Sequence, residues 1–379
     1  MKKTLIALAA LAATAGVAHA QSSVTLYGVV DAYVGVNEVK QNGPGTTSTK
    51  LSQGVVNGSG LSSSRWGMRG SEDLGGGLAA VFTLESGFSI DTGAMANNNG
   101  SGSNASSVLF GREASVGLKG AFGEARLGRQ YTAYDALRGA TNNTYDSNTF
   151  ATTSTIWNNG VQDYSNRVNN AVSYKSPVFG GFSAAVAYGF GEDKTATTSA
   201  SSSTSFHVKY ANGPLLVGYG YQREKSTIGS TLFSGVQAIG GATNGLAGGT
   251  AGAAATFADT RKYNLFGAAY DFGVAKITGS YNTAKGAVAP GVNGKDKEFQ
   301  VGVSAPFGAA ALAAGYSRSK SEFLNTSTKA TGYSLLGTYD LSKRTTLYAG
   351  YINQKAESVL TAGREDRRQL YATGVRHTF

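Results

Sequence analysis

The feature that most constrains the fold of this 379-residue chain is a repeated unit, an alternating run of apolar and polar residues closed by a turn. Within Phe182–Phe190, for example, Ala184, Val186 and Tyr188 occupy one set of alternate positions, and small residues occupy most of the other set. A period of two is the signature of a β-strand with two different faces. Because this unit recurs along the chain from residue 24 to the end, we expect an all-β protein.

Sixteen such runs can be recognised, most of them about 10–13 residues long. They are Val24–Val36, Ser62–Glu72, Gly77–Gly87, Ser107–Gly120, Gly123–Gln130, Asn166–Ser176, Phe179–Phe190, Ser203–Ala211, Pro214–Glu224, Asp259–Asp271, Gly273–Lys285, Asp296–Ala305, Gly308–Lys320, Thr328–Tyr339, Ser342–Lys355 and Arg367–Phe379. Seven short turns rich in Gly, Pro, Asn and Asp alternate strictly with eight long polar loops. This order is typical of an up-and-down meander with the tight turns at one end and the long loops at the other.

The length and number of the runs favour a barrel that spans a membrane. A tilted strand of roughly 9–11 residues crosses a bilayer, and bacterial barrels have an even number of strands. A soluble two-sheet sandwich also shows alternation, but the chain offers no place to divide into two packed sheets. We therefore expect a 16-stranded antiparallel transmembrane β-barrel, closed so that no strand edge is left unpaired and wide enough for an aqueous lumen.

Basic residues within the runs indicate which face is polar. They are Arg65, Arg69, Arg126, Arg167 and Lys276. A lipid-facing Arg costs roughly 2–4 kcal/mol at mid-membrane. These side chains are therefore expected to line the lumen, while the apolar alternate positions face lipid.

The first 20 residues have the pattern of a secretory signal peptide. Lys2 and Lys3 precede an apolar run, and Ala18–Ala20 has the small residues of a cleavage site. Removal of residues 1–20 would leave a mature barrel of residues 21–379. The formal net charge would fall from +10 to +8, because two lysines are lost.

The composition disfavours several other classes of function. Cysteine is absent, so neither a disulfide framework nor a thiolate metal site is expected, and no cofactor is expected. His207 and His377 are the only histidines after the signal peptide, and no HExxH, GxSxG or P-loop motif occurs. The positive charges are spread singly in an exported chain, which does not favour nucleic acid binding. We do not expect an enzyme.

The connection from Tyr131 to Ser165 differs from the others. It has about 35 residues, whereas connections in compact domains usually have ~4–6. Phe150, Ile156 and Trp157 give it more apolar area than a flexible linker has. Neither a helical period nor strand alternation is evident in it. A disordered surface loop is the alternative, but the pattern favours a segment that folds back into the barrel.

Five motifs are spread along the whole mature chain: QSSVTLYG at 21–28, SRWGMRGSEDLG at 64–75, FGREASVGL at 110–118, GEARLGRQ at 123–130 and the terminal segment Tyr371–Phe379. Together they resemble the motifs of general trimeric porins of the Gram-negative outer membrane, of the betaproteobacterial and neisserial type. The resemblance implies a homotrimer in the cell outer membrane, surrounded by lipid and lipopolysaccharide. It also implies that the terminal Phe379 is read by the outer-membrane insertion machinery.

The same resemblance implies a pore constriction. In that family the third long loop narrows the barrel midway, and residues 131–165 form the third long connection here. The family's arginine cluster on the facing wall maps onto Arg65, Arg112 and Arg167. No sharp motif marks the acidic residues on the loop; the candidates are Asp135 and Asp146, followed by Asp163.

Arg112 carries two conflicting indications. Counted by alternation, it shares a face with Val116 and Leu118, and neither face of this run is cleanly lipid-like. The resemblance instead places Arg112 in the lumen. A contact of this strand with a neighbouring subunit would relax the pattern, and alternation alone does not decide the question.

These features predict a general porin that lets small hydrophilic solutes and ions diffuse passively. Arginine rings are typical of anion pores, and the mature chain is basic, so we expect a preference for anions. A solute-selective channel with a lumenal binding track is the alternative, which ordered aromatic residues in the lumen would favour. A structural or adhesive barrel with a plugged lumen is an alternative of a different class, and it would not conduct.

Overall fold

The computed structural model describes residues 23–43, 48–95, 108–142, 149–157, 161, 163–226, 259–289, 291–324, 326–357 and 363–379. The predicted signal peptide and the candidate Asp146 lie outside the described residues.

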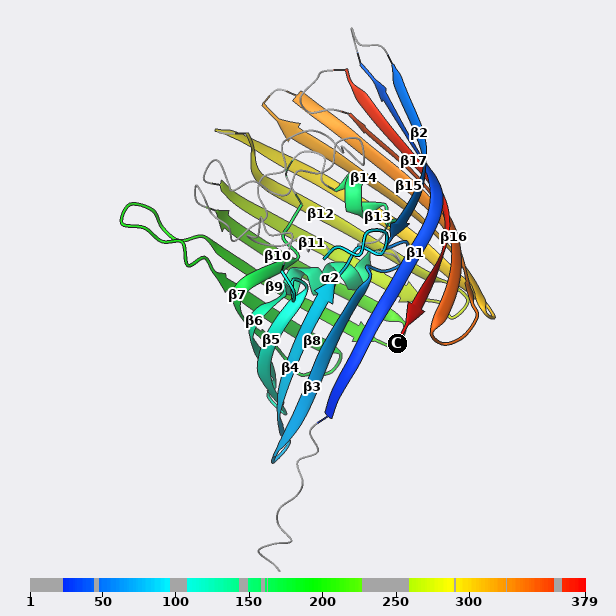
Figure 1. The fold of residues 1–379 in the computed structure, drawn as a ribbon. Coiled ribbons are helices and arrows are strands. Elements are labelled where there is room, and N and C mark those ends of the chain that lie inside the picture. Colours follow the sequence, from blue (N-terminus) through cyan, green and yellow to red (C-terminus); the bar gives the residue numbers. More distant parts are fainter. Residues whose placement is uncertain are drawn as a thin grey trace, which may run out of the picture.

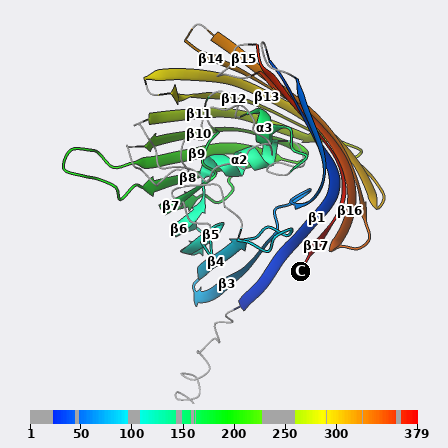
Figure 2. The same cartoon turned by 45° about the horizontal axis from the view of Figure 1, so that its top comes forward.

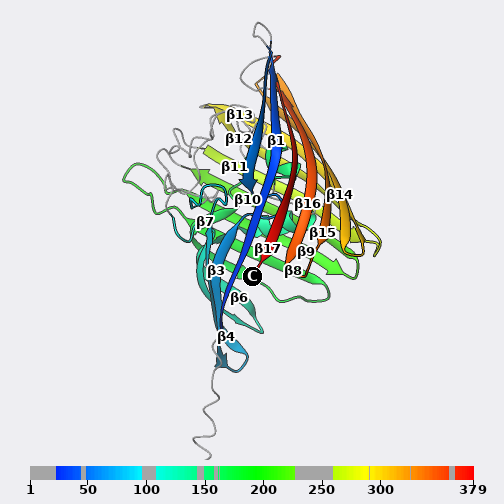
Figure 3. The same ribbon diagram turned by 45° about the vertical axis from the view of Figure 1, so that its right-hand side comes forward.

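In the described chain, seventeen strands form one closed antiparallel sheet, the barrel of Figure 1. They are β1 (Ser23–Asn42), β2 (Thr49–Gly58), β3 (Arg65–Gly75), β4 (Leu78–Gly87), β5 (Glu113–Gly120), β6 (Gly123–Tyr131), β7 (Arg167–Lys175), β8 (Phe182–Phe190), β9 (Ser202–Asn212), β10 (Leu215–Ser226), β11 (Asp259–Asp271), β12 (Lys276–Ala289), β13 (Val292–Phe307), β14 (Ala310–Phe323), β15 (Thr326–Asp340), β16 (Thr345–Glu357) and β17 (Glu365–Thr378). The barrel closes where β1 pairs with β17, the two strands that lie side by side in Figure 3.

The barrel nevertheless has sixteen strand positions around its circumference, because β2 and β3 share one of them. β3 pairs with the beginning of β1, over Ser23–Val29, and β2 pairs with its later part, over Ala32–Gln41. Both therefore lie along the edge of β1 that faces away from β17. The predicted 16-stranded antiparallel barrel is confirmed.

The strands extend further at the long-loop end than the alternation predicted. The expectation of one long polar loop over residues 37–61 is wrong, because β1 continues to Asn42 and β2 occupies most of the remainder. Most of the predicted loop 286–295 is likewise strand. The outward side chains need to be apolar only where lipid covers them. The alternation of apolar and polar residues therefore ends near the membrane surface, although the hydrogen bonds between neighbouring strands continue beyond it.

The two faces of the barrel differ as the alternation predicted. On β9, Ser205 and His207 are almost fully buried on the inner face, whereas Phe206 and Val208 are 36% and 46% exposed on the outer face. An exposed apolar band of this kind is the surface that lipid covers in a membrane barrel.

Two short helices, α2 (Ala133–Thr141) and α3 (Thr153–Ile156), lie between β6 and β7. Within the part of the chain that the structure describes, no helix is long and apolar enough to span a membrane. Short turns join the strands at the other end of the barrel. Gly213, between β9 and β10, has a φ of 53°, a left-handed conformation that glycine adopts without strain.

Candidate functional site

The segment between β6 and β7 lies inside the ring of strands, where Figure 2 shows both helices. The interpretation that this segment has no helical period is wrong, because the segment contains α2 and α3. The side chain of Thr132 caps α2 by accepting a hydrogen bond from the Asp135 backbone N–H at 3.2 Å. Ala133, Leu137 and Thr141 then recur every four residues on one buried face. A nine-residue helix whose buried face is made of Ala, Leu and Thr gives only a weak sequence signal.

Hydrogen bonds attach the start of α2 to the inner wall. The backbone N–H of Ala133 donates to the Ser205 hydroxyl at 3.0 Å, and its carbonyl lies 2.6 Å from Nδ1 of His207. The hydroxyl of Tyr134 donates to Oδ1 of Asn282 at 2.7 Å. His207 is therefore a wall residue that holds the inward segment, in agreement with its predicted mid-strand position.

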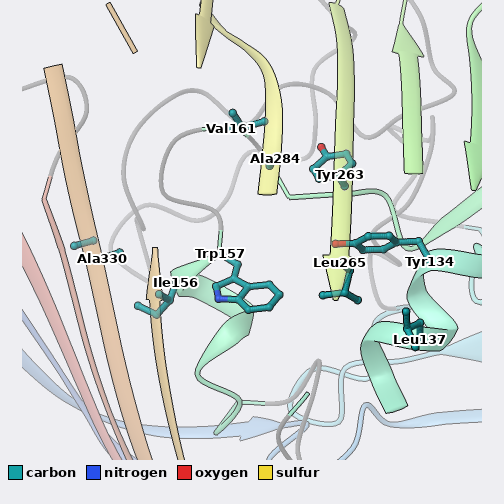
Figure 4. Packing of buried hydrophobic residues seen from close by; sticks show 10 residues of the cluster. Tyr134, Leu137, Ile156, Trp157, Val161, Tyr263, Leu265, Ala284 and Ala330 are labelled. Atoms are coloured by element: carbon teal, nitrogen blue, oxygen red, sulfur yellow. The ribbon is translucent and has the colours of Figure 1, made fainter. Parts of the chain in front are cut away.

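Apolar packing attaches the same segment over a wider arc of wall (Figure 4). The buried cluster comprises Tyr134, Leu137, Ile156, Trp157 and Val161 of the segment, and Tyr263, Leu265, Ala284, Ala330 and Ala356 of the strands. Burial of one large apolar side chain contributes about 1.5–3 kcal/mol. Several such side chains hold the segment on the wall formed by β11–β16.

A second apolar cluster lies further along the barrel. Phe150 is fully buried among Tyr33 of β1, Leu61 and Tyr348 of β16, and the backbone N–H of Thr149 donates to the Ser59 carbonyl at 3.0 Å. The inward segment therefore follows the inner wall from β8 round to β1. The wall from β3 to β7 faces it.

Three predicted arginines meet on that facing wall, around one carboxylate and one phenol. Nε of Arg112 lies 2.5 Å from Oε1 of Glu85, and Nε of Arg65 lies 3.4 Å from Oε2. The hydroxyl of Tyr131 accepts hydrogen bonds from Arg112, at 2.8 Å, and from Arg167. The guanidinium of Arg167 also stacks over the Tyr131 ring at 4.2 Å.

The conflict over Arg112 has a simple structural answer. β5 begins at Glu113, so Arg112 precedes the strand and its alternation does not apply. The side chain turns inward to Glu85 and is 11% exposed.

Two residues of this wall were not predicted. Glu85 shares the inner face of β4 with Thr83, a signal that alternation could have given. Arg129 donates to the Gly111 carbonyl at 2.7 Å and to Oδ1 of Asn169 at 2.6 Å. Its position was harder to foresee, because the register of β6 shifts at that residue.

The loop acids have partners within their own segment. Oδ1 of Asp135 accepts a hydrogen bond from the Tyr164 hydroxyl at 2.6 Å. Asp163 accepts two from Nη1 of Arg138, at 2.7 and 2.8 Å, and that guanidinium also stacks on Trp157 at 5.0 Å. Asp163 therefore stabilises the fold of the segment.

The three predicted wall residues lie further toward the short turns. Arg126 pairs with Glu124 and, at 3.1 Å, with Glu113, and Arg69 stacks over the Tyr27 ring at 5.1 Å. Lys276 is exposed at the start of β12, where alternation puts it on the face of buried Thr278. None of these three lies in the cluster around Glu85. Within the described residues, no three His, Asp or Glu side chains gather as a metal ion would require.

A closed barrel with an apolar outer face, a polar inner face and an inward segment opposite a basic wall defines a channel of the outer membrane. A family model described as Gram-negative porin matches residues 7–358. Outer membrane porin protein 32 of Delftia acidovorans is 34% identical, over 99% of this chain and 95% of its own length. An outer membrane porin of Bordetella pertussis is 32% identical over the full length of both chains. A solved anion-selective porin from Comamonas acidovorans superposes with a TM-score of 0.71 at 30% identity, covering 95% of this chain and all of that one.

The chain therefore belongs to the Gram-negative porin family, and it is an outer-membrane porin. The resemblance predicted from its sequence motifs is confirmed.

Proposed function

We propose that this porin passes small hydrophilic solutes and ions with a preference for anions, through a waist between residues 131–165 and the wall that carries Arg65, Arg112 and Arg167. The observation that carries the proposal is the gathering of these three arginines on one wall, where Arg65 and Arg112 pair with Glu85 and Arg167 donates to the Tyr131 hydroxyl. On this side of the waist, the three arginines and the carboxylate of Glu85 leave an excess of two positive charges.

The size of this excess charge is enough to select among small ions. Two unit charges 4 Å apart interact by about 1 kcal/mol in water and about 4 kcal/mol at an effective dielectric of 20. A narrow pore with protein walls lies between these limits, so an anion is attracted and a cation repelled. The similarity to a solved porin described as anion-selective supports the same direction.

The inward segment supplies the acidic side of the waist in this proposal, through Asp135 and Asp146. Carboxylates facing arginines create a transverse field that orients polar solutes. Arg69, Arg126 and Lys276 extend the basic lining toward the short-turn mouth.

Reversal potentials in planar bilayers under a salt gradient test the proposal. Replacing Arg65, Arg112 and Arg167 together by Ser should raise the conductance. It should also move the reversal potential toward zero, the value of a pore without ion selectivity. A matched variant with Lys262, Lys285 and Lys295 replaced by Ser removes the same charge from the outer face and should leave selectivity unchanged. A cation preference in the native protein, or unchanged selectivity in the arginine variant, would contradict the proposal.

Four further features complete the proposed function. Residues 1–20 are a cleaved signal peptide, the assembly is a homotrimer surrounded by outer-membrane lipid and lipopolysaccharide, and the protein catalyses no reaction. Phe379 exchanges two backbone hydrogen bonds of 3.1 Å with Gly28, and its side chain remains 46% exposed. An aromatic terminus that completes the barrel and still presents its ring suits recognition by the insertion machinery.

A further inference from the structure

Tyr131 lies at the junction between the barrel wall and the inward segment. It is the last residue of β6 and stands opposite Arg167, the first residue of β7. The next residue along the chain, Thr132, caps α2. The two strands and the start of the helix therefore hold Tyr131 at the edge of the proposed waist.

The hydroxyl oxygen of Tyr131 accepts hydrogen bonds from two guanidinium groups. Arg112 donates to it from Nη2 at 2.8 Å, and Arg167 donates to it from its own Nη2. The Arg167 guanidinium also stacks on the ring, with Cζ 4.2 Å from the ring centroid. One phenol thus holds two positive groups close together.

The hydrogen of the same hydroxyl has no acceptor among the residues that the structure describes. The carboxylate of Glu85 instead accepts the Tyr27 hydroxyl at 3.0 Å and pairs with Arg65 and Arg112. Because a phenol both donates and accepts, the O–H of Tyr131 remains available to a solute. Hydrogen-bonded groups polarise one another, so two cationic donors on the oxygen strengthen this O–H as a donor.

The groups of this wall differ in their access to a solute. Arg112 and Arg167 are buried. The Arg65 side chain is 28% exposed, and Tyr131 is only partly buried. An anion that reaches the wall therefore contacts Arg65 and the phenol, whereas Arg112 and Arg167 act mainly through their charge and through Tyr131.

Guanidinium charge and a phenol O–H select for different properties of an anion. The attraction between two charges depends on their size, their separation and the dielectric, so it acts alike on formate and nitrate, two small planar anions of the same charge. A hydrogen bond also depends on the basicity of the acceptor. A carboxylate oxygen is more basic than a nitrate oxygen, so only the phenol O–H separates the two anions.

We propose that Tyr131 is a specificity-determining residue of the waist, whose O–H donates to anions with strongly basic oxygens, such as carboxylates. It favours them over weakly basic anions of the same charge. The proposal rests on the proposed function, because the anions have to pass this wall. It adds a selection among anions to the selection of anions over cations.

Reversal potentials in planar bilayers with formate on one side and nitrate on the other test the proposal. Tyr131→Phe removes only the hydroxyl and keeps the ring that stacks with Arg167. We expect the ratio of formate to nitrate permeability to fall about threefold. This is part of what a hydrogen bond to a charged group contributes, because a solute in a wet pore makes the contact only transiently. The ratio of chloride to potassium permeability should change little, because no charge is removed.

The control is Tyr219→Phe, which removes a phenol hydroxyl from the outer face. There the hydroxyl donates to Oδ1 of Asn264 at 2.9 Å, and the ring packs against Phe266, which is 58% exposed. This variant should change neither permeability ratio.

An unchanged ratio of formate to nitrate permeability in Tyr131→Phe would overturn the proposal, and so would an equal fall in Tyr219→Phe. A weaker preference for chloride over potassium with an unchanged formate-to-nitrate ratio would also overturn it, and would leave Tyr131 only the role of holding the arginines. If Tyr131→Phe does not refold, the native protein decides, because a ratio equal to that of the two ions' mobilities in free solution excludes the selection. A cation preference in the native protein would contradict the proposed function, whereas the formate-to-nitrate ratio would still decide the role of Tyr131.

Discussion

The phenol of Tyr348 on β16 donates a hydrogen bond of 2.6 Å to the carboxylate of Asp31 on β1. The same carboxylate, which is fully buried, accepts the backbone N–H groups of Gly60 at 3.0 Å and of Leu61 and Ser62 at 2.8 Å. Asp31 therefore holds the chain inward at the interruption between β2 and β3.

This anchor also supports the far end of the inward segment. The Ser59 carbonyl next to the anchor accepts the N–H of Thr149. The Phe150 ring lies 6.5 Å from the Tyr33 ring and 6.2 Å from the Tyr348 ring. A change at Asp31 should therefore reach the proposed waist, although Asp31 itself lies on β1.

We predict that Asp31→Asn loosens this end of the segment. The NH₂ group of the asparagine would replace one carboxylate oxygen and would face backbone N–H groups, which are also donors. At least one hydrogen bond to a charged group is therefore lost, which costs about 1.5–3 kcal/mol of stability. Denaturant unfolding in detergent micelles measures the cost, and single-channel recording should show a noisier open current. Asp340→Asn, near the short turns, is the control and should change neither. Native stability and a quiet current in Asp31→Asn would show that the anchor is dispensable.

The sequence predicted the strands well where lipid imposes the alternation. β11 begins and ends at the predicted residues, Asp259 and Asp271. It failed for β2, where outward residues such as Lys50 and Ser52 need not be apolar. Outward-facing residues need to be apolar only where the bilayer covers them, so the alternating pattern is confined to that part of each strand.

The proposed site was less predictable, because it depends on contacts between distant strands. Spacing alone could not bring Arg65 to Arg167, and only the family resemblance suggested it. Arg112 was ambiguous because alternation was counted back past the start of β5, which begins one residue later at Glu113. Glu85 was overlooked because its strand is otherwise mostly apolar, and its role depends on arginines from two other segments.

We predict that Glu85→Gln strengthens anion preference. The change removes the negative charge between Arg65 and Arg112. An interaction of about 1 kcal/mol at 4 Å in water corresponds to a change of up to about fivefold in the ratio of anion to cation permeability. Reversal potentials under a salt gradient measure the ratio.

The control for this change is Glu124→Gln, which removes a carboxylate paired with Arg126 near the short-turn end of β6. It should shift the ratio less than Glu85→Gln does. A shift of Glu85→Gln toward cations would mean that the freed arginines fold away from the lumen, and that the charge balance proposed for the waist is incorrect.

We predict that Gly267→Ala displaces α2 from the wall. A Cβ at this position of β11 would lie 2.2 Å from Oγ1 and 2.7 Å from Cγ2 of Thr141, the last residue of the helix. Overpacking of this kind costs about 1–3 kcal/mol, and the helix can relieve it only by moving into the lumen. Single-channel conductance should therefore fall. Gly279→Ala on β12 is the control, because its Cβ would be 3.7 Å from its nearest neighbour, the Gln300 carbonyl oxygen. An unchanged conductance in Gly267→Ala would mean that this end of α2 does not border the conducting path.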